Sequence, residues 1–178
     1  MSTPHPPKPA KLVVSVLINN RKSIDTVGRE LTRVFGDMDL ISPWFSFHYT
    51  DYYRKEMGSG LTRRVFSFQS LVHQSDLAHI KISTNAMEKL FSQDGKRTVN
   101  IDPGYILQER FVLGTGKNFA HRIYIGGGIY SDLTLIYTKG AFTKLPWTYP
   151  DYVAEEMLSF LLMVRARYSV DLGRLGQR

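Results

Sequence analysis

The side chains best suited to act on a ligand are gathered in one glycine- and aromatic-rich stretch, residues 97–138. Carboxylates and imidazoles there could transfer protons, and lysine and arginine could bind an anion. Two residues, Asp102 and His121, are the candidate catalytic residues. The candidate ligand-binding residues are Thr50, Tyr105, Lys117, Asn118 and Arg122.

The segment Gly114-Thr115-Gly116-Lys117 resembles part of a phosphate-binding loop. A P-loop requires GxxxxGK followed by Ser or Thr, but residue 111 is Phe and residue 118 is Asn. We therefore expect no P-loop. Lys117 and nearby backbone amides could still bind an anion, with Arg122, Arg63 and Lys81 as further cations, or the segment could be a simple glycine-rich turn.

Asp102-Pro103-Gly104 follows a short predicted strand at residues 98–101 and has the composition of a turn. Asp102 could act as a base or bind a cation. Equally, its carboxylate could cap its own backbone, as is common before Pro-Gly.

Gly126-Gly127-Gly128 predicts a hairpin between residues 121–125 and 129–138. In that register Arg122 lies opposite Asp132, and the two could form a purely structural cross-strand pair. His121 could then be a satisfied core residue and not a proton donor or acceptor.

The remaining histidines suggest two weaker hypotheses. His48-Tyr49-Thr50 and His73-Gln74-Ser75 match the His-x-Ser/Thr motifs of two-histidine phosphoesterases, but only about two dozen residues separate them. No histidine pair has zinc-ligand spacing such as HExxH, so we expect no metal site, and no cofactor is indicated.

Hydrophobic patterning predicts an α+β fold: a single-domain sandwich with an antiparallel or mixed sheet and helices mainly on one face. We expect residues 1–10 to be a disordered Pro-rich tail and residues 11–178 to be one domain. The expected strands are 11–18, 44–49, RRVFSFQSLV within 61–72, and 98–101 plus the hairpin, and residues 110–113 are undecided. The expected helices are 24–35, about 75–80, 85–91 with an Asn85–Glu88 capping box, and one starting near Pro150.

The composition restricts the function further. The chain has no cysteine, which excludes disulfides and thiol catalysis, and it has no apolar stretch long enough to span a bilayer and no apolar signal segment. We therefore expect a cytoplasmic protein without membrane contact. A net charge of +7 favours a small anionic ligand or leaves a merely basic surface.

Nucleic acid is a possible but not favoured partner. Residues 44–49 and 52–55 interleave aromatic rings with cations, as a base-stacking surface does. Most of these rings are expected in the core instead. An interaction module for protein or nucleic acid is therefore the alternative to a small-ligand protein, and the sequence does not decide whether the chain is an enzyme or what its oligomeric state is.

Four motifs in order, TDYY with EMG (Thr50–Gly58), NIDPGY (Asn100–Tyr105), KNFAHRIYIGGGIY (Lys117–Tyr130) and TYPDY (Thr148–Tyr152), resemble domain-of-unknown-function family 4416. The resemblance implies a prokaryotic single-domain protein of about this length and implies no mechanism. Some members are labelled GTP-binding. Here there is no Walker A motif and no Asn-Lys-x-Asp, and Asp102-Pro103-Gly104 is not the Asp-x-x-Gly of GTPases.

Overall fold

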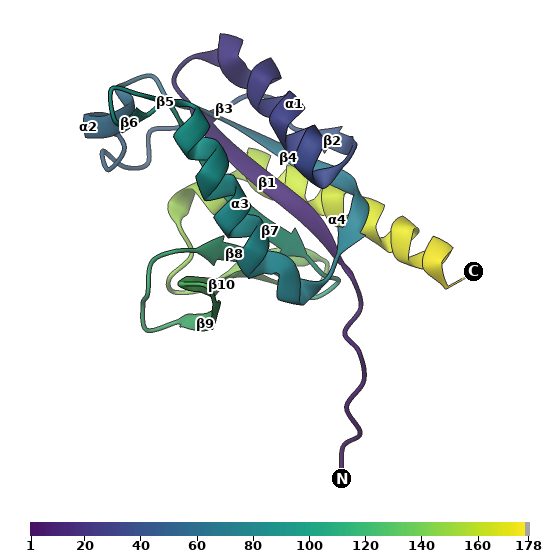
Figure 1. Cartoon of the computed structure of the whole chain (residues 1–178). Coiled ribbons are helices and arrows are strands. Elements are labelled where there is room, and N and C mark those ends of the chain that lie inside the picture. Colours follow the sequence, from purple (N-terminus) through teal and green to yellow (C-terminus); the bar gives the residue numbers. More distant parts are fainter. Residues whose placement is uncertain (177–178) are drawn as a thin grey trace.

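A nine-stranded antiparallel sheet forms the centre of the computed structural model, which describes residues 1–176 (Figure 1). Its main strands run in the order β11-β10-β8-β7-β1-β4-β2, and β3 and β9 join it by pairing with β4 and β10. The strands are β1 (Ala10–Ile18), β2 (Met38–Ile41), β3 (Phe45–Ser46), β4 (Thr62–Val72), β7 (Val99–Ile106), β8 (Arg110–Thr115), β9 (Arg122–Gly126), β10 (Ile129–Thr138) and β11 (Ala141–Lys144), with a separate small hairpin of β5 (Ser92–Gln93) and β6 (Lys96–Arg97).

The helices are α1 (Ile24–Phe35), α2 (Arg54–Met57), α3 (Leu77–Leu90) and α4 (Glu155–Leu175), and the 3-10 turns are Arg21–Ser23, Gln74–Asp76 and Pro150–Tyr152. The elements β1-α1-β2-β4-α3-β7 form a β-α-β-β-α-β unit in which β1 and β4 lie between β2 and β7. Strands β8, β10 and β11 extend this unit on the β7 side. None of the helices in residues 1–176 is long and apolar enough to span a membrane.

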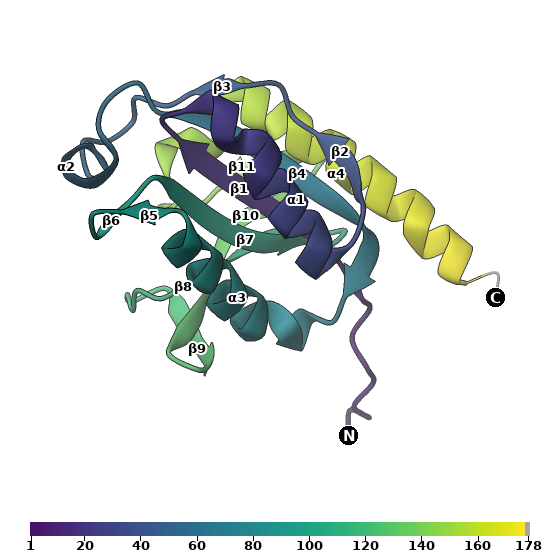
Figure 2. The same cartoon turned by 45° about the horizontal axis from the view of Figure 1, so that its top comes forward.

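Strand β1 is buried along its whole length, as its near-continuous apolar run predicts, and the burial includes Lys11 and Ser15. Alternate residues from Leu12 to Ile18 pack with α1 and α3, whereas Val13 packs in the core that includes α4. Figure 2 shows α1 and α3 on one face of the sheet and α4 on the other. The predicted α+β class is confirmed, and two of the three long helices share a face.

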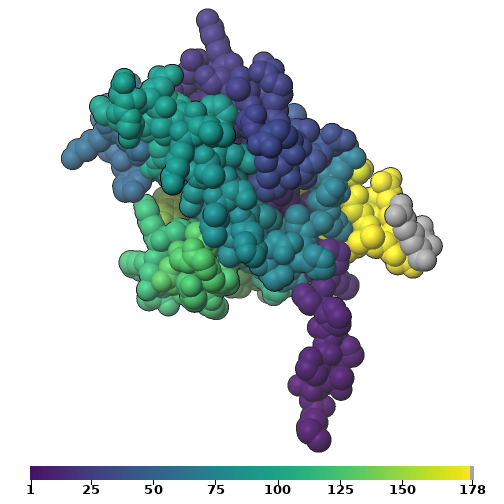
Figure 3. Space-filling model, in the orientation of Figure 1, coloured from purple at the N-terminus to yellow at the C-terminus, as the bar shows by residue number. Residues whose placement is uncertain are grey.

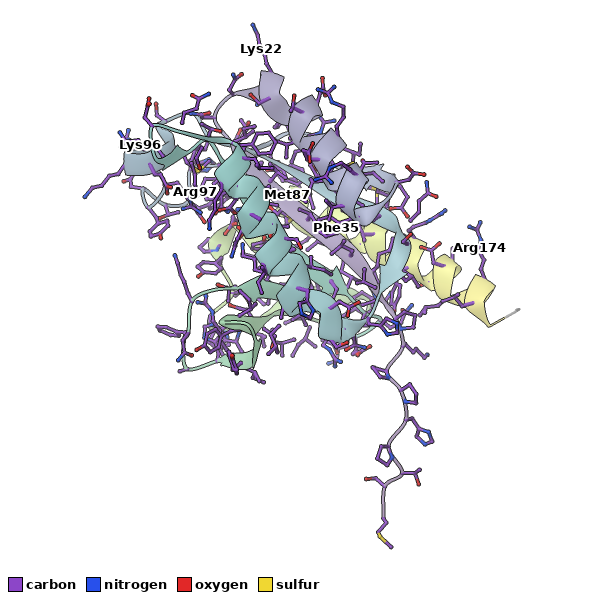
Figure 4. All side chains as sticks on the ribbon, in the orientation of Figure 1. Lys22, Phe35, Met87, Lys96, Arg97 and Arg174 are labelled. Carbon is purple, nitrogen blue, oxygen red and sulfur yellow. The ribbon has the colours of Figure 1, made fainter. Side chains whose placement is uncertain are left out.

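The face covered by α1 and α3 fills most of Figure 3, with the N-terminal residues before β1 projecting from it. Phe35 of α1 and Met87 of α3, both labelled in Figure 4, contribute to the core beneath these helices. Gly36 ends α1 with φ +86°, as is common for a glycine at a helix C-terminus, and the helix predicted over residues 24–35 has these same bounds.

Several predicted boundaries were wrong. The strand expected over residues 44–49 is reduced to Phe45–Ser46, because the chain leaves the sheet to form a cavity wall. The two helices expected around 75–80 and 85–91 are one helix, since no glycine or proline interrupts residues 77–90, and Asn85 caps nothing. A 3-10 turn occupies Pro150–Tyr152 before α4 begins at Glu155, and the undecided residues 110–113 are strand.

The turn predicted at Asp102-Pro103-Gly104 was also wrong, because all three residues lie inside β7 and pair with β1. A proline within a strand needs a side on which its missing N–H is not required. Pairing between β7 and β8 begins only at Gly104, so Pro103 lies where β7 has no partner on that side. Asp102 is therefore a strand residue at a free edge and not a turn cap.

Candidate functional site

Strands β7 and β8 separate to form the two sides of a fork. They pair only between Gly104–Ile106 and Phe111–Leu113. Before Gly104, β7 pairs only with β1, and after Leu113, β8 pairs only with β10. A Cβ atom on Gly104 would lie 2.4 Å from the Val112 carbonyl oxygen, so glycine permits the close contact at the base of the fork.

The space within the fork is a cavity of about 560 Å³, a volume typical of small-molecule sites. Helix α3 covers one side and contributes side chains at helical spacing, namely Lys81, Asn85 and Glu88. Aromatic side chains from two loops form the opposite wall: Phe47, Tyr49, Tyr52, Tyr53, Tyr149 and Tyr152. The cavity is therefore part charged and part aromatic.

Arg63 is the most deeply buried cation of the cavity, with only 5% of its side chain exposed. It stands on β4 and its guanidinium lies against the Asp151 carboxylate. Its Cζ atom is 4.9 Å from the ring centroid of Phe47 and 5.0 Å from that of Tyr152. Among residues 1–176 no acceptor bonds its Nε–H. A buried donor without a partner is costly, and because this atom has almost no exposed surface, a ligand or water would meet it only if the side chains around it move.

Asp102 projects from the free edge of β7 and pairs with Lys81 of α3. Lys81 Nζ donates to Asp102 Oδ1 at 3.1 Å and to the Ile101 carbonyl oxygen at 2.8 Å. Burial raises the pKa of Asp102, but Lys81, Arg63 and a hydrogen bond from Asn100 outweigh burial and hold the pKa below its usual range. Asp102 is therefore an ionised hydrogen-bond acceptor.

Arg97 connects the cavity to α2 and the end of α3 (Figure 4). It donates to Glu56 Oε2 at 2.7 Å, to Glu88 Oε2 at 3.0 Å and to Asn100 Oδ1 at 3.0 Å. Burial raises the pKa of Glu88 despite the opposing effects of Lys81, the Ile101 N–H and Arg97. Two carboxylates of one cavity thus have pKa values displaced in opposite directions.

The predicted β9–β10 hairpin is confirmed, with Arg122 opposite Asp132 and Tyr124 opposite Tyr130. Arg122 Nε donates to Asp132 Oδ2 at 2.9 Å, and Arg122 also donates to the Tyr149 hydroxyl at 2.8 Å. Gly126, Gly127 and Gly128 all have positive φ, which explains the glycines of this turn. The ion pair holds the hairpin and also lines the cavity.

His121 lies behind this pair and does not line the cavity. Its Nε2 is 3.2 Å from Asp132 Oδ2, and its ring stacks on Trp147 with centroids 4.8 Å apart. Trp147 is itself fixed by a hydrogen bond to the Leu133 carbonyl oxygen. His121 is therefore placed to orient Asp132 and not to contact a ligand.

Lys117 lies at the exposed rim of the cavity, after the end of β8. Its Nζ is 4.0 Å from the ring centroid of Tyr52 on the opposite loop. A strand, β9, and not a helix follows the Gly114–Lys117 segment, which agrees with the expectation that it is no P-loop. A Cβ on Gly114 would be 3.1 Å from Leu77 Cδ1, so this glycine lets α3 pack closely on β8.

Four of the predicted site residues line the cavity and three do not. Thr50, Asp102, Lys117 and Arg122 come together there. Tyr105 is buried in the core shared with α4, Asn118 is exposed, and His121 lies behind Asp132. Sequence reasoning missed Glu88, Arg97, Asn100 and Asp151. The spacing of Lys81, Asn85 and Glu88 was the available signal, but it was hidden by treating Asn85 as a helix cap.

The fold does not support the two hypotheses based on histidines, a two-histidine phosphoesterase and a metal site. His48 follows β3 near the start of β4, and His73 follows the end of that strand. The eleven residues of β4 separate them by roughly 35 Å at about 3.3 Å per residue. Two imidazoles so placed cannot share one phosphate, and no group of three potential metal ligands occurs within residues 1–176.

A family model described as "Domain of unknown function (DUF4416)" matches residues 8–168, and the chain therefore belongs to that family. This confirms the resemblance drawn from the four motifs. No curated protein and no solved structure matches the chain.

Proposed function

We propose that this member of a family of unknown function binds a small anionic ligand, such as a phosphate or carboxylate compound, in the cavity between β7 and β8. The observation that carries the proposal is Arg63, a buried guanidinium on the cavity wall whose Nε–H has no partner within residues 1–176. An oxyanion that displaced the neighbouring Phe47 or Tyr152 ring would complete the hydrogen bonding of this group.

Neighbouring hydroxyl groups favour the same ligand chemistry. Burial raises the pKa values of Tyr53 and Tyr152, both of which line the cavity beside Arg63. Their hydroxyls therefore stay protonated at neutral pH and can donate hydrogen bonds. A guanidinium with neutral phenols nearby suits an anion better than a cation.

Arg63 pairs with Asp151, and most of the other cavity cations also pair with carboxylates, so what distinguishes Arg63 is its Nε–H without a partner among residues 1–176. Lys81 pairs with Asp102, Arg97 with Glu88, and Arg122 with Asp132. Lys117 pairs with no carboxylate among residues 1–176 and stands at the rim over Tyr52. We therefore assign Arg63 to binding inside the cavity and Lys117 to attraction at its entrance.

An interaction module for protein or nucleic acid is less well supported. The aromatic residues that could stack on bases, including Phe47, Tyr49 and Tyr53, line the cavity wall and do not form a flat surface. Their arrangement with the charged groups favours a small molecule.

The test is calorimetric titration and thermal unfolding with inorganic phosphate, pyrophosphate and citrate. A ligand at 100 times its Kd stabilises the folded state by about 2.7 kcal/mol, which raises Tm measurably. Arg63→Lys keeps a charge beside Asp151 but removes the Nε donor, and it should weaken binding at least tenfold. Lys117→Met should also weaken binding.

Lys144→Met, on exposed β11 outside the cavity, is the matched control and should bind as the unaltered protein does. If none of the three anions binds, or if Arg63→Lys and Lys144→Met behave alike, the proposed function is wrong.

A further inference from the structure

The carboxylates of the cavity differ sharply in how far they are open to it. Three are nearly covered by protein, with 7% of the Glu88 side chain, 6% of Asp132 and 10% of Asp151 exposed. Asp102 is 29% exposed. It is therefore the one of these four carboxylates that a bound molecule can readily reach.

Asp102 also has unused hydrogen-bonding capacity. Its Oδ1 accepts one bond from Lys81 Nζ at 3.1 Å, and its Oδ2 accepts one from Asn100 Nδ2 at 2.6 Å. An ionised carboxylate offers about four lone-pair sites and no donor. A ligand group that binds to Asp102 must therefore be a hydrogen-bond donor.

The charge around Asp102 selects between a neutral and a cationic donor. Lys81 already neutralises this carboxylate, and Arg63 and Arg97 line the same cavity. An ammonium group beside Asp102 would compete with Lys81, which already neutralises this carboxylate, whereas a neutral hydroxyl group would not be repelled by Lys81. The surroundings of Asp102 therefore favour a neutral hydroxyl donor over a cationic ammonium donor.

We infer that the ligand is a hydroxylated anion, of the class of polyol or sugar monophosphates, with a hydroxyl group that donates to Asp102 and an anionic group against Arg63. This inference rests on the proposed function, since it assumes that an anion occupies the cavity. It adds that Asp102 accepts a hydrogen bond from the ligand's hydroxyl group and so selects hydroxylated anions over anions without a hydroxyl.

The experiment compares three monophosphates by calorimetry: glycerol 3-phosphate, methyl phosphate and phosphoethanolamine. The first carries free hydroxyls, the second carries none, and the third carries an ammonium group. We expect glycerol 3-phosphate to bind at least tenfold more tightly than methyl phosphate, because a hydrogen bond to a charged group is among the stronger ones. This comparison uses the unaltered protein and does not depend on any variant folding.

Asp102→Asn tests the residue itself, because it nearly preserves shape and leaves one oxygen to accept from Lys81. The preference for glycerol 3-phosphate should fall below about threefold, while methyl phosphate affinity should not decrease. Asp37→Asn, at an exposed aspartate remote from the cavity, is the control and should keep the full preference. Thermal unfolding of each variant establishes that it is folded.

Three outcomes would overturn the inference. Equal affinity for glycerol 3-phosphate and methyl phosphate would remove the hydroxyl requirement, and a preference that survives in Asp102→Asn would remove Asp102 from recognition. Tighter binding of phosphoethanolamine than of glycerol 3-phosphate would replace the hydroxyl with an ammonium. In all three cases anion binding itself, and with it the proposed function, would stand; failure of every phosphate to bind would refute both.

Discussion

Two buried clusters of opposite charges in this protein use similar residues in different ways. In the first, Lys11 of β1 is fully buried and donates to Asp39 and, at 2.7 Å, to Asp171 of α4. Arg167 Nε lies 3.3 Å from a carboxylate oxygen of each aspartate. In the second, Lys81 pairs with Asp102 at the edge of the cavity.

The difference lies in what surrounds the carboxylate. Asp39 and Asp171 are 7% and 11% exposed, whereas Asp102 is 29% exposed and lines a cavity. The Lys11 cluster joins strands β1 and β2 to α4 and has little room for a ligand. The same ion-pair chemistry is therefore closed off by protein in one region and leaves an acceptor open to the cavity in the other.

The largest expected effect is that of Lys11→Met. Removing Lys11 leaves two buried carboxylates with Arg167 as their one remaining cation in this cluster, so the free energy of unfolding should fall by about 3–5 kcal/mol in urea titrations. Lys81→Met should cost less, about 1–3 kcal/mol, because solvent can reach Asp102. The exposed Lys8→Met is the control. An equal loss at Lys11 and Lys81 would contradict the distinction between the clusters.

A smaller effect is expected at the base of the fork. Gly104→Ala places a Cβ atom 2.4 Å from the Val112 carbonyl oxygen, so the strands must move apart at a cost of about 1–3 kcal/mol. Gly116→Ala, with nothing within 4 Å of its Cβ position, is the matched control. Urea unfolding measures both. If Gly104→Ala were neutral, β7 and β8 would not depend on that close contact.

The pH dependence of stability should differ between the clusters. Burial raises the pKa of Asp39, but Lys11, Ser67 and Arg167 outweigh it and hold the pKa below the ordinary 3.8. Asp39 therefore contributes stability at neutral pH that is lost as pH falls below about 5 and through the lowered pKa. Asp39→Asn should make the acid side of the stability profile shallower, as urea unfolding between pH 7 and pH 3 would measure.

Glu88 of the cavity should affect the pH dependence of stability in the opposite direction to Asp39, because its pKa is raised above 4.5, mainly by burial. Its contribution is present below pH 4.5 and is lost as pH rises through the raised pKa. Glu88→Gln should therefore cost less stability at pH 7 than Asp39→Asn does. A larger loss for Glu88→Gln would show that its bonds with Arg97 and Ile101 outweigh the burial of its charge.

The smallest effect on stability is expected for Lys117→Met. The lysine is exposed and its contact with Tyr52 is a cation–π interaction, so the free energy of unfolding should change by no more than about 1 kcal/mol. Anion affinity should nevertheless fall. A large loss of stability in urea unfolding, with unchanged phosphate affinity, would make Lys117 a structural residue instead.

Local patterns predicted the elements whose determinants are local. The strand predicted from the mainly apolar residues 11–18, the helix over residues 24–35 and the three-glycine hairpin with Arg122 opposite Asp132 were all confirmed. The Asp102-Pro103-Gly104 prediction was wrong because turn composition also fits a strand with one free edge. Asn85 was misassigned because a capping pattern has no meaning inside an uninterrupted helix.

The sequence by itself determined the α+β class, the family and a polar segment from which Asp102, Lys117 and Arg122 reach one cavity. Only the tertiary structure decided which cations and carboxylates meet. Arg63 and Asp151 are far apart in the chain, as are Lys11 and Asp171, and strand pairing with helix docking brings each pair together. Burial then sets which of these groups a ligand can reach, because solvent access depends on neighbours that no local pattern identifies.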